Sequence, residues 1–368
     1  MNKTRTLAAA VMACAGVATT TQAFAQSSVT LYGIVDEGLT YTTNQNGHSN
    51  WQMQSGVSQG SRWGLRGAED LGGGMRAIFV LENGFDPSTG VLGQNGRLFG
   101  RSAYVGLDSR LGTLTLGRQY EFMTDYVSPV SAQGQWGIYF AHAGDVDNLN
   151  GTFRVNNAAK YQSPSLGGFH LGALYSFGGQ PGSFSTYSVV SVGANYSNGG
   201  PLYAAAAYTH VNSPYAAVYD SLPKNALYTK YLPSATSQDI YGLGATYLLG
   251  SFKFGLNATR TVFHSGLDGA NVNFNNYEAW LGYYISPALQ VGGGYTLTDV
   301  DERATGNKPR YQQVNLMVDY FLSKRTDVYA MAACLNGSSG TRAQMDYVTA
   351  ASSNNRQALW RVGIRHKF

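Results

Sequence analysis

The stretch from residue 121 to residue 151 contains four acidic side chains and no lysine or arginine. The acids are Glu121, Asp125, Asp145 and Asp147. Carboxylates beside a narrow aqueous passage act on the ions that cross it, because low-dielectric walls focus the field of a few charges. A loop of this length inside a compact structure is usually functional. The composition therefore predicts a stretch that discriminates between cations and anions, provided that other elements place basic side chains opposite it.

Candidate cations follow the alternation of a β-strand, in which successive side chains point to opposite faces. Arg62 and Arg66 share one parity, whereas Trp63 lies on the other. Arg154 and Lys160 likewise share a parity, and aromatic residues occupy the opposite one. We therefore predict that these four cations line a water-filled interior.

Other charged residues are weaker candidates for the same interior. Arg76 shares a parity with Glu82, and Arg118 lies just before the acidic stretch. We also place Asp36 beside Arg62 as a hypothesis. The alternative for each basic residue is a solvated side chain or a salt bridge at the end of a strand. The alternative for the acids of the stretch is a loop carboxylate in bulk water.

The final segment, QALWRVGIRHKF (357–368), shows the same alternation. Trp360, Val362 and Ile364 share a parity with Phe368, and the three cations share the other: Arg361, Arg365 and Lys367. A soluble sheet would bury the apolar face, whereas a membrane barrel would turn it to lipid and its cations to interior water. The segment alone is compatible with both.

The first 25 residues have the features of a secretory signal peptide. Lys3 and Arg5 precede an apolar run, which ends at the small-residue triplet Ala23-Phe24-Ala25. Lipoprotein processing at Cys14 is the alternative, but it would split the apolar run. We therefore predict removal of residues 1–25 and one domain over 26–368.

Removal of that peptide leaves 23 basic and 21 acidic residues. This balance is too even to suggest nucleic acid as a partner. One cysteine, Cys334, remains, so no intrachain disulfide is possible. The chain lacks CxxC, HExxH and a Walker lysine, and we predict neither a cofactor nor a metal site.

The composition favours an all-β transmembrane protein. Only 12% of the residues are charged, against about 25% in an ordinary globular domain, and the chain has 46 glycines and 26 tyrosines. No stretch of the processed chain offers 18 uncharged apolar residues for a helical span. A barrel needs apolar residues only at alternate positions, with tyrosines in girdles at the two interfaces.

Most of the chain divides into strands that short turns and longer polar connections join alternately, as in an antiparallel outer-membrane barrel of about 16 strands. The predicted strands are 28–43, 52–70, 73–85, 97–109, 112–120, 152–163, 168–178, 186–198, 201–212, 237–250, 251–263, 272–286, 287–299, 309–323, 324–336 and 356–368. The predicted long connections are 44–51, 86–96, 121–151, 213–236, 264–271, 300–308 and 337–355.

Several phrases resemble the neisserial-type general porins of β-proteobacteria. They are VTLYGIVDEGLTY (29–41), GSRWGLRGAEDLGGGMRAIFVLENGF (60–85), GRLFGRSAYVGL (96–107), LGTLTLGRQY (111–120) and FRVNNAAKYQSPSLGGFHLGALYSF (153–177). The resemblance covers residues 28–368 and is weakest in the loops after residue 210. It implies a trimeric outer-membrane barrel whose third long loop folds inward, and passive diffusion of small hydrophilic solutes and inorganic ions.

The resemblance also implies roles for particular residues. It places Arg101 on the pore wall, and it assigns Arg62, Arg101 and Arg154 to a basic cluster that faces the inserted loop. Phe368 resembles the signal that the barrel-assembly machinery reads. Outer-membrane lipid and lipopolysaccharide are the partners expected around such a barrel. We expect a modest preference for anions.

Two other functions are alternatives to a channel. An outer-membrane barrel enzyme would need a serine or an acid pair beside an oriented histidine. The adjacent pairs His264-Ser265 and His48-Ser49 lie in predicted loops without an evident carboxylate partner, so we predict that the protein is not an enzyme. An adhesin or other barrel without a conducting pore would not need the divided charges.

Overall fold

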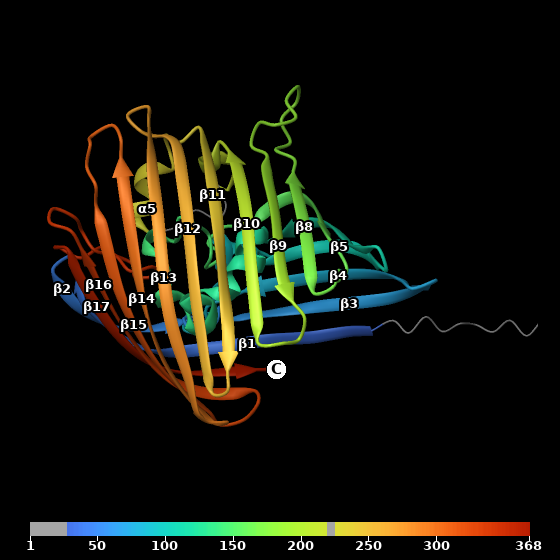
Figure 1. The fold of residues 1–368 in the computed structure, drawn as a ribbon, viewed down its shortest axis with the longest axis horizontal. Helices are drawn as coiled ribbons and strands as arrows, with labels where there is room; N and C mark the ends of the chain where they lie inside the picture. The colour runs from blue at the N-terminus through green and yellow to red at the C-terminus, as the bar shows by residue number, and fades with distance from the viewer. Residues whose placement is uncertain (1–27, 219–224) are drawn as a thin grey trace, which may run out of the picture.

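The computed structural model describes residues 28–218 and 225–368, which form one antiparallel sheet that closes on itself (Figure 1). Closure occurs where the first strand pairs with the last, from Ile34↔Lys367 to Thr42↔Leu359. The predicted signal peptide, residues 1–25, lies outside the described residues. Within the described ranges, no helix has both the length and the apolar character needed to cross a membrane.

Seventeen strands make up the sheet, and from β3 onwards each pairs with its neighbours in sequence. They are β1 (Ser28–Gln45), β2 (His48–Ser55), β3 (Arg62–Gly72), β4 (Met75–Gly84), β5 (Ser102–Ser109), β6 (Gly112–Gln119), β7 (Val155–Gln162), β8 (Phe169–Ser176), β9 (Val189–Ser197), β10 (Leu202–Asn212), β11 (Ser237–Leu249), β12 (Phe252–Leu267), β13 (Ala270–Ser286), β14 (Leu289–Glu302), β15 (Arg310–Phe321), β16 (Thr326–Gly337) and β17 (Arg356–Lys367). The predicted all-β barrel is therefore confirmed.

Strands β2 and β3 occupy a single span of the wall. Both pair with β1, β2 along its second half and β3 along its first, so the 17 strands form a barrel of 16 spans. The strand predicted over 52–70 is thus interrupted at 56–61. The connection between β6 and β7 contacts this interruption, because the backbone N–H of Ile138 donates to the carbonyl of Val57 at 2.8 Å.

Two connections that were predicted to be long are tight hairpins. β1 and β2 are joined by Asn46-Gly47, and β12 and β13 are joined by Asp268-Gly269. All four residues have positive φ, between 47° and 97°. Asn-Gly and Asp-Gly favour two-residue turns of this kind because their φ values match the twist of the flanking strands. The predictions of loops at 44–51 and 264–271 were therefore wrong.

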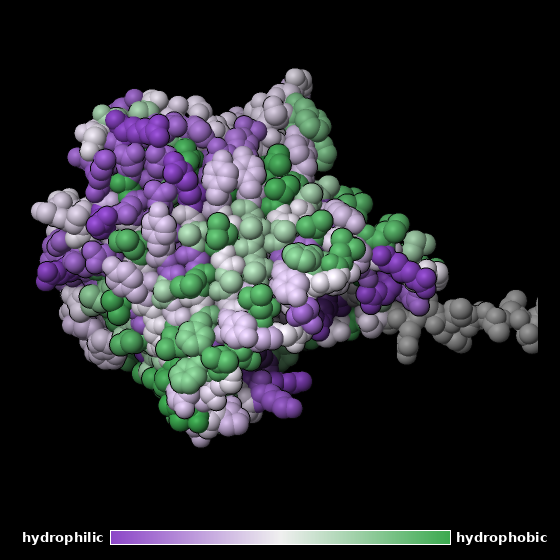
Figure 2. Space-filling view, viewed as in Figure 1, coloured by the Kyte–Doolittle hydropathy of each residue, from purple (hydrophilic) through white to green (hydrophobic). Residues whose placement is uncertain are grey.

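The two faces of the barrel differ in chemistry. On β15 the side chains of Gln313, Asn315 and Asp319 are buried, whereas those of Leu316 and Val318 are exposed. The other strands that form the second half of the sheet show the same alternation. In Figure 2, hydrophobic residues spread over the middle and lower part of the wall, and hydrophilic residues gather towards the upper, loop end. The outer surface is therefore suited to lipid.

Within the described residues, short helices occupy three of the connections. They are α2 (Gly93–Gly96), η1 (Met123–Val127), η2 (Ser128–Val130), α3 (Ala132–Trp136), η3 (Ile138–Phe140), η4 (Ala143–Asp145), α4 (Pro214–Ala217) and α5 (Ala226–Tyr231). The five from η1 to η4 belong to the connection between β6 and β7. They lie beside the sheet in Figure 1.

The connection between β6 and β7 bonds to side chains of the buried, polar face of the strands. The N–H of Ala132 donates to Glu278 Oε1 at 2.8 Å. Gln313 Nε2 donates to the carbonyl of Tyr139 at 3.0 Å, and Gln238 Nε2 donates to that of Val146 at 2.9 Å. These bonds hold it against β11, β13 and β15. Apolar contacts, such as Trp136 with Trp280 at 5.2 Å between ring centroids, add to them.

Candidate functional site

Three arginines from separate elements lie close together, and two of them contact one carboxylate. Arg62 Nε lies 3.7 Å from Glu82 Oε2, and Arg101 Nε lies 2.8 Å from Glu82 Oε1. Arg154 joins the cluster through Tyr120: it donates to the phenolic oxygen, and its guanidinium carbon lies 4.7 Å from the ring centroid. The guanidinium carbon of Arg101 lies 6.0 Å from the same ring. The three arginines that the family resemblance grouped are therefore close together.

Strand register explains the contact of Arg62 with Glu82. Arg62 of β3 pairs with Gly84 of β4, and Gly64 pairs with Glu82. Arg62 and Glu82 are therefore diagonal neighbours on adjacent strands, and their side chains point to the same face of the sheet. Arg101 immediately precedes β5, and its N–H donates to the carbonyl of Glu82 at 3.1 Å. Parity predicts which face a side chain takes, but it does not reveal the register between strands. For this reason Glu82 and Tyr120 were not predicted to be members of the cluster.

The cluster is partly solvated and carries excess positive charge. The side chains of Arg62 and Arg101 are 22% and 14% exposed, and that of Glu82 is 12% exposed. Burial alone would raise the pKa of the Tyr120 phenol, but Arg101 and Arg154 outweigh it and lower that pKa. Arginine stays protonated at physiological pH. Three cations and one carboxylate leave a formal local charge of about +2.

The two candidate acids of the 121–151 stretch have partners away from these arginines. Glu121 is fully buried and accepts five hydrogen bonds, from residues of its own connection and from Thr209 of β10. Burial raises the pKa of its carboxyl, and those hydrogen bonds oppose the rise. Asp125 is ion-paired with Lys160, whose Nζ also donates to the carbonyl of Tyr120 at 2.8 Å. The carboxylate that contacts the arginines is that of Glu82, on the wall.

The remaining candidate charges lie apart from the cluster or at its edge. Arg66 is exposed and stacks on Tyr32, and Arg76 is 58% exposed and paired with Asp108. Arg118 is buried and donates to the carbonyl of Gly100 at 2.8 Å. Asp36 is fully buried, and its ion pair is with Arg361 at 3.5 Å. The structure therefore does not support the hypothesis that placed Asp36 against Arg62.

Residues 8–340 match the family model described as Gram-negative porin. This match covers most of the chain. The chain belongs to the Gram-negative porin family. It is an outer-membrane β-barrel that functions as a channel, and its relatives are porins rather than enzymes.

The relatives span the whole porin. An outer membrane porin protein of Bordetella pertussis is 31% identical, with 100% of both chains covered. Outer membrane porin protein 32 of Delftia acidovorans is also 31% identical, with 98% of this chain and 99% of the relative covered. Among solved structures, an anion-selective porin from Comamonas acidovorans has 27% identity and a TM-score of 0.77, over 93% of this chain and 100% of the other. A trimer form of OmpT from Vibrio cholerae, at 14% identity and a TM-score of 0.69, shares the fold.

The porin also contains a second cluster of buried charges, which the sequence did not predict. His142 Nδ1 lies 2.6 Å from Asp147, and its Nε2 lies 3.6 Å from Glu278 of β13. Burial alone would lower the pKa of His142, but Asp147 outweighs it and raises that pKa to about 10. The imidazole therefore stays protonated between these two acidic side chains. Within the described residues, no group of three or more His, Cys, Asp or Glu side chains could hold a metal ion.

Proposed function

We propose that the connection between β6 and β7 narrows the channel, and that Arg62, Arg101 and Arg154 give this narrow section a modest preference for anions. The preference is electrostatic, because charges at a water-filled constriction act on ions more strongly than charges in a wide vestibule. Small hydrophilic solutes and inorganic ions would cross by passive diffusion.

One observation carries the proposal: the cluster of three arginines contains one carboxylate, Glu82, while Asp125 is neutralised by Lys160 and Glu121 is enclosed by hydrogen bonds. The acids that might have cancelled the cluster therefore have other partners. The relative with the TM-score of 0.77 is named an anion-selective porin, which is consistent with a positive constriction in this chain.

The reversal potential of the purified porin in a KCl gradient tests this proposal. We expect the wild type to favour Cl⁻ at 0.1 M salt, and less so at 1 M, because the Debye length falls from about 10 Å to about 3 Å. Replacing Arg62, Arg101 and Arg154 together by Gln should shift the potential towards K⁺. A control that replaces the turn residues Arg110, Lys324 and Arg325 by Gln removes the same charge at exposed sites and should leave it nearly unchanged.

Two results would contradict the proposal. K⁺ preference in the wild type at 0.1 M salt would refute the sign of the selectivity. Equal shifts in the cluster variant and the turn variant would show that net charge matters and that the cluster has no special place in the channel.

We further propose that the porin is a homotrimer surrounded by outer-membrane lipid and lipopolysaccharide, and that it is exported with residues 1–25 as a cleaved signal peptide. The trimer form of a porin with the same fold supports the assembly. Electrophoresis after extraction in a mild detergent should give a trimer that dissociates on heating. Mass spectrometry of the processed chain should place its amino terminus at Gln26.

A further inference from the structure

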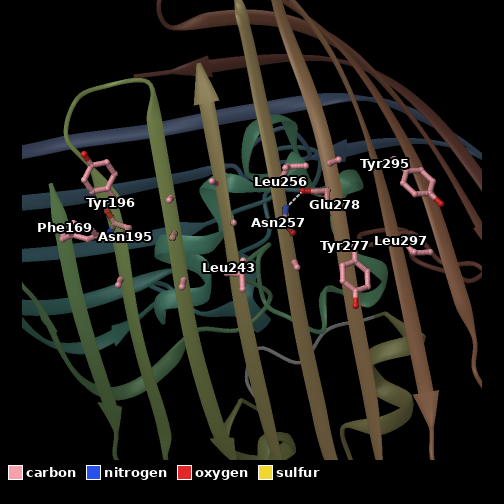
Figure 3. Close-up of a pocket in the computed structure, with 18 residues that line it drawn as sticks. Phe169, Asn195, Tyr196, Leu243, Leu256, Asn257, Tyr277, Glu278, Tyr295 and Leu297 are labelled. Atoms are coloured by element: carbon pink, nitrogen blue, oxygen red, sulfur yellow. Dashed lines mark hydrogen bonds between the residues drawn. The ribbon is translucent and has the colours of Figure 1, made fainter. Parts of the chain in front are cut away.

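The outer wall carries a hollow of about 850 Å³ across β8–β14 (Figure 3). Its floor is made of alanines that point outwards: Ala194, Ala204, Ala206, Ala245, Ala258 and Ala279. Bulkier side chains rise around them, among them Tyr196, Leu243 and Tyr277 (Figure 3). The hydrogen-bonded pair Asn257 and Glu278 belongs to the opposite, buried face.

Strand register brings the small side chains together. Ala204 of β10 pairs with Ala245 of β11, and Ala206 of β10 pairs with Ala194 of β9. Cross-strand neighbours have their Cβ atoms about 5 Å apart, so adjoining alanines leave a depression between taller residues. The depression is apolar and open along the wall.

The next row towards the loops is polar. Register pairs connect Tyr208 to Tyr241, Tyr241 to Arg260, and Arg260 to Asn275, so one row crosses β10–β13. Arg260 lies two residues beyond Ala258 on the same face of β12 and is exposed. Its guanidinium Nη1 lies 3.5 Å from Asn275 Oδ1.

The acids at this level already have other partners. Asp239 contacts His210 and His264, each at 2.6 Å, and Asp299 pairs with Arg310 at 2.6 Å. Among the described residues no carboxylate is ion-paired with Arg260. A cation on the lipid-facing wall is costly near the bilayer centre and tolerated near the interface, where anionic headgroups attract it. The guanidinium group of Arg260 can therefore bind an external anion next to the apolar hollow.

We propose that this surface binds one phosphate-bearing lipid, with an acyl chain over the alanines and a headgroup phosphate at Arg260. Lipid tails are as apolar as the wall, so hydrophobicity alone cannot select an occupant, and selection must come from shape and charge. Both features are present side by side here. The row lies on the loop side of the apolar band, which faces the cell exterior in an outer-membrane barrel. The lipid is therefore the phosphorylated glycolipid of the outer leaflet.

Native mass spectrometry of the folded porin in detergent tests this assignment with two probes, bis-phosphorylated lipid A and the same lipid without its phosphates. Arg260→Gln should weaken binding of the phosphorylated probe about fivefold, the effect expected of one basic residue at an anionic surface, and should spare the dephosphorylated probe. Arg325→Gln, in an exposed turn at the opposite end of the barrel, is the matched control and should bind as the wild type does.

A second variant tests the hollow. Ala245→Phe should fill it and reduce binding of both probes, whereas Ala330→Phe, on the outer face of β16 and outside this hollow, should not. If Ala245→Phe does not fold, Ala206→Leu replaces it. Unchanged binding in Arg260→Gln would overturn the phosphate contact, and unchanged binding in the filled variant would overturn the acyl site. Dissociation of an oligomer by the filled variant would identify the face as a contact between copies and also overturn the proposal.

The lipid-binding measurements test a property that is independent of the anion selectivity proposed above. Arg260 lies on the outer wall, so Arg260→Gln should leave the reversal potential of the channel unchanged. Loss of lipid binding with normal selectivity would support the lipid site alone.

Discussion

Glu82 is the residue on which the charge of the arginine cluster depends. Its two oxygens contact different arginines, and the phenol of Tyr32 donates to Oε2 at 3.0 Å. The carboxylate thus holds Arg62 and Arg101 in fixed positions while it cancels one of the three charges. A cation beside a water-filled space acts at short range, so the placement of these few groups matters more than the near-even balance of the whole chain.

Glu82→Gln keeps the shape of this side chain and removes its charge. The formal charge of the cluster rises from about +2 to about +3, so we expect the reversal potential in a KCl gradient to move further towards Cl⁻. The shift should be larger at 0.1 M than at 1 M salt. Glu69→Gln makes the same change at an exposed position of β3 and is the control. Equal potentials in the two variants would show that ions do not sense Glu82.

At the scale of elements, the seam between β1 and β17 contains a buried ion pair. Arg361 Nη2 lies 3.5 Å from Asp36 Oδ1, and both side chains have 0% exposure. Tyr329 of β16 bridges them, because its hydroxyl donates to Asp36 and accepts from Arg361 Nε at 2.9 Å. Arg361 also donates to the carbonyl of Gly38 at 3.1 Å. The network therefore ties the last two strands to the first.

Arg361→Gln should destabilise the closed barrel. Removing one partner leaves Asp36 as an unpaired buried charge, which typically costs about 3–5 kcal/mol. Arg356→Gln, an exposed position on the same strand, should cost less than about 1 kcal/mol. Urea unfolding followed by circular dichroism measures both. The double variant with Asp36→Asn should recover part of the loss, and failure to recover any would argue against the ion pair as its cause.

The connection between β16 and β17 contacts the connection between β6 and β7 through a buried carboxyl group. Asn150 Nδ2 donates to Asp346 Oδ2 at 3.1 Å. Burial raises the pKa of Asp346 to about 6, and burial together with Asp346 and Asp147 raises the pKa of Asp145. A carboxyl with a raised pKa in the folded state stabilises the fold below its unfolded pKa, near 4, and this stability is lost as pH rises through the folded value.

Asp346→Asn should therefore stabilise the porin at pH 7.5 by about 1–3 kcal/mol and flatten the dependence of its unfolding free energy on pH between 4 and 7. The amide imitates the protonated carboxyl, so no charge has to be desolvated. Asp268→Asn, in the exposed turn between β12 and β13, is the control and should retain the wild-type slope. The same slope in Asp346→Asn would show that another group titrates.

Much of the wall could be predicted, because the period of a strand is two and a barrel repeats that pattern in every span. The alternation predicted that the side chains of Arg62 and Arg154 both point into the interior of the barrel. The hairpins at Asn46 and Asp268 were predictable from their following glycines, but the polar residues around them resembled loops. Register was not predictable, because pairing is set by contacts between strands far apart in sequence. The partners Glu82, Tyr120 and Asp36 depend on register, and the sequence could not assign them.

At the scale of the whole molecule, Phe368 completes the closure of the barrel. Its N–H donates to the carbonyl of Gly33, and its carbonyl accepts from the N–H of Gly33, both at 3.0 Å. Its ring packs over the same glycine: a Cβ at position 33 would lie 2.3 Å from the ring. Gly33 thus leaves the space that the ring occupies. The residue predicted to be an assembly signal is in contact with the first strand.

The last prediction separates closure from recognition by the assembly machinery. If Phe368 acts only in closure, Phe368→Ser should lower the folded yield equally in cells and in refolding into lipid vesicles without other proteins. We propose that the machinery also reads this residue, so the loss should be several-fold larger in cells, with export unaltered. Ile364→Ser, an exposed apolar position on the same face of β17, is the control and should lose little in either setting. Folded yield is measured by heat modifiability on gels, and equal losses for Phe368→Ser in the two settings would leave closure as its sole role.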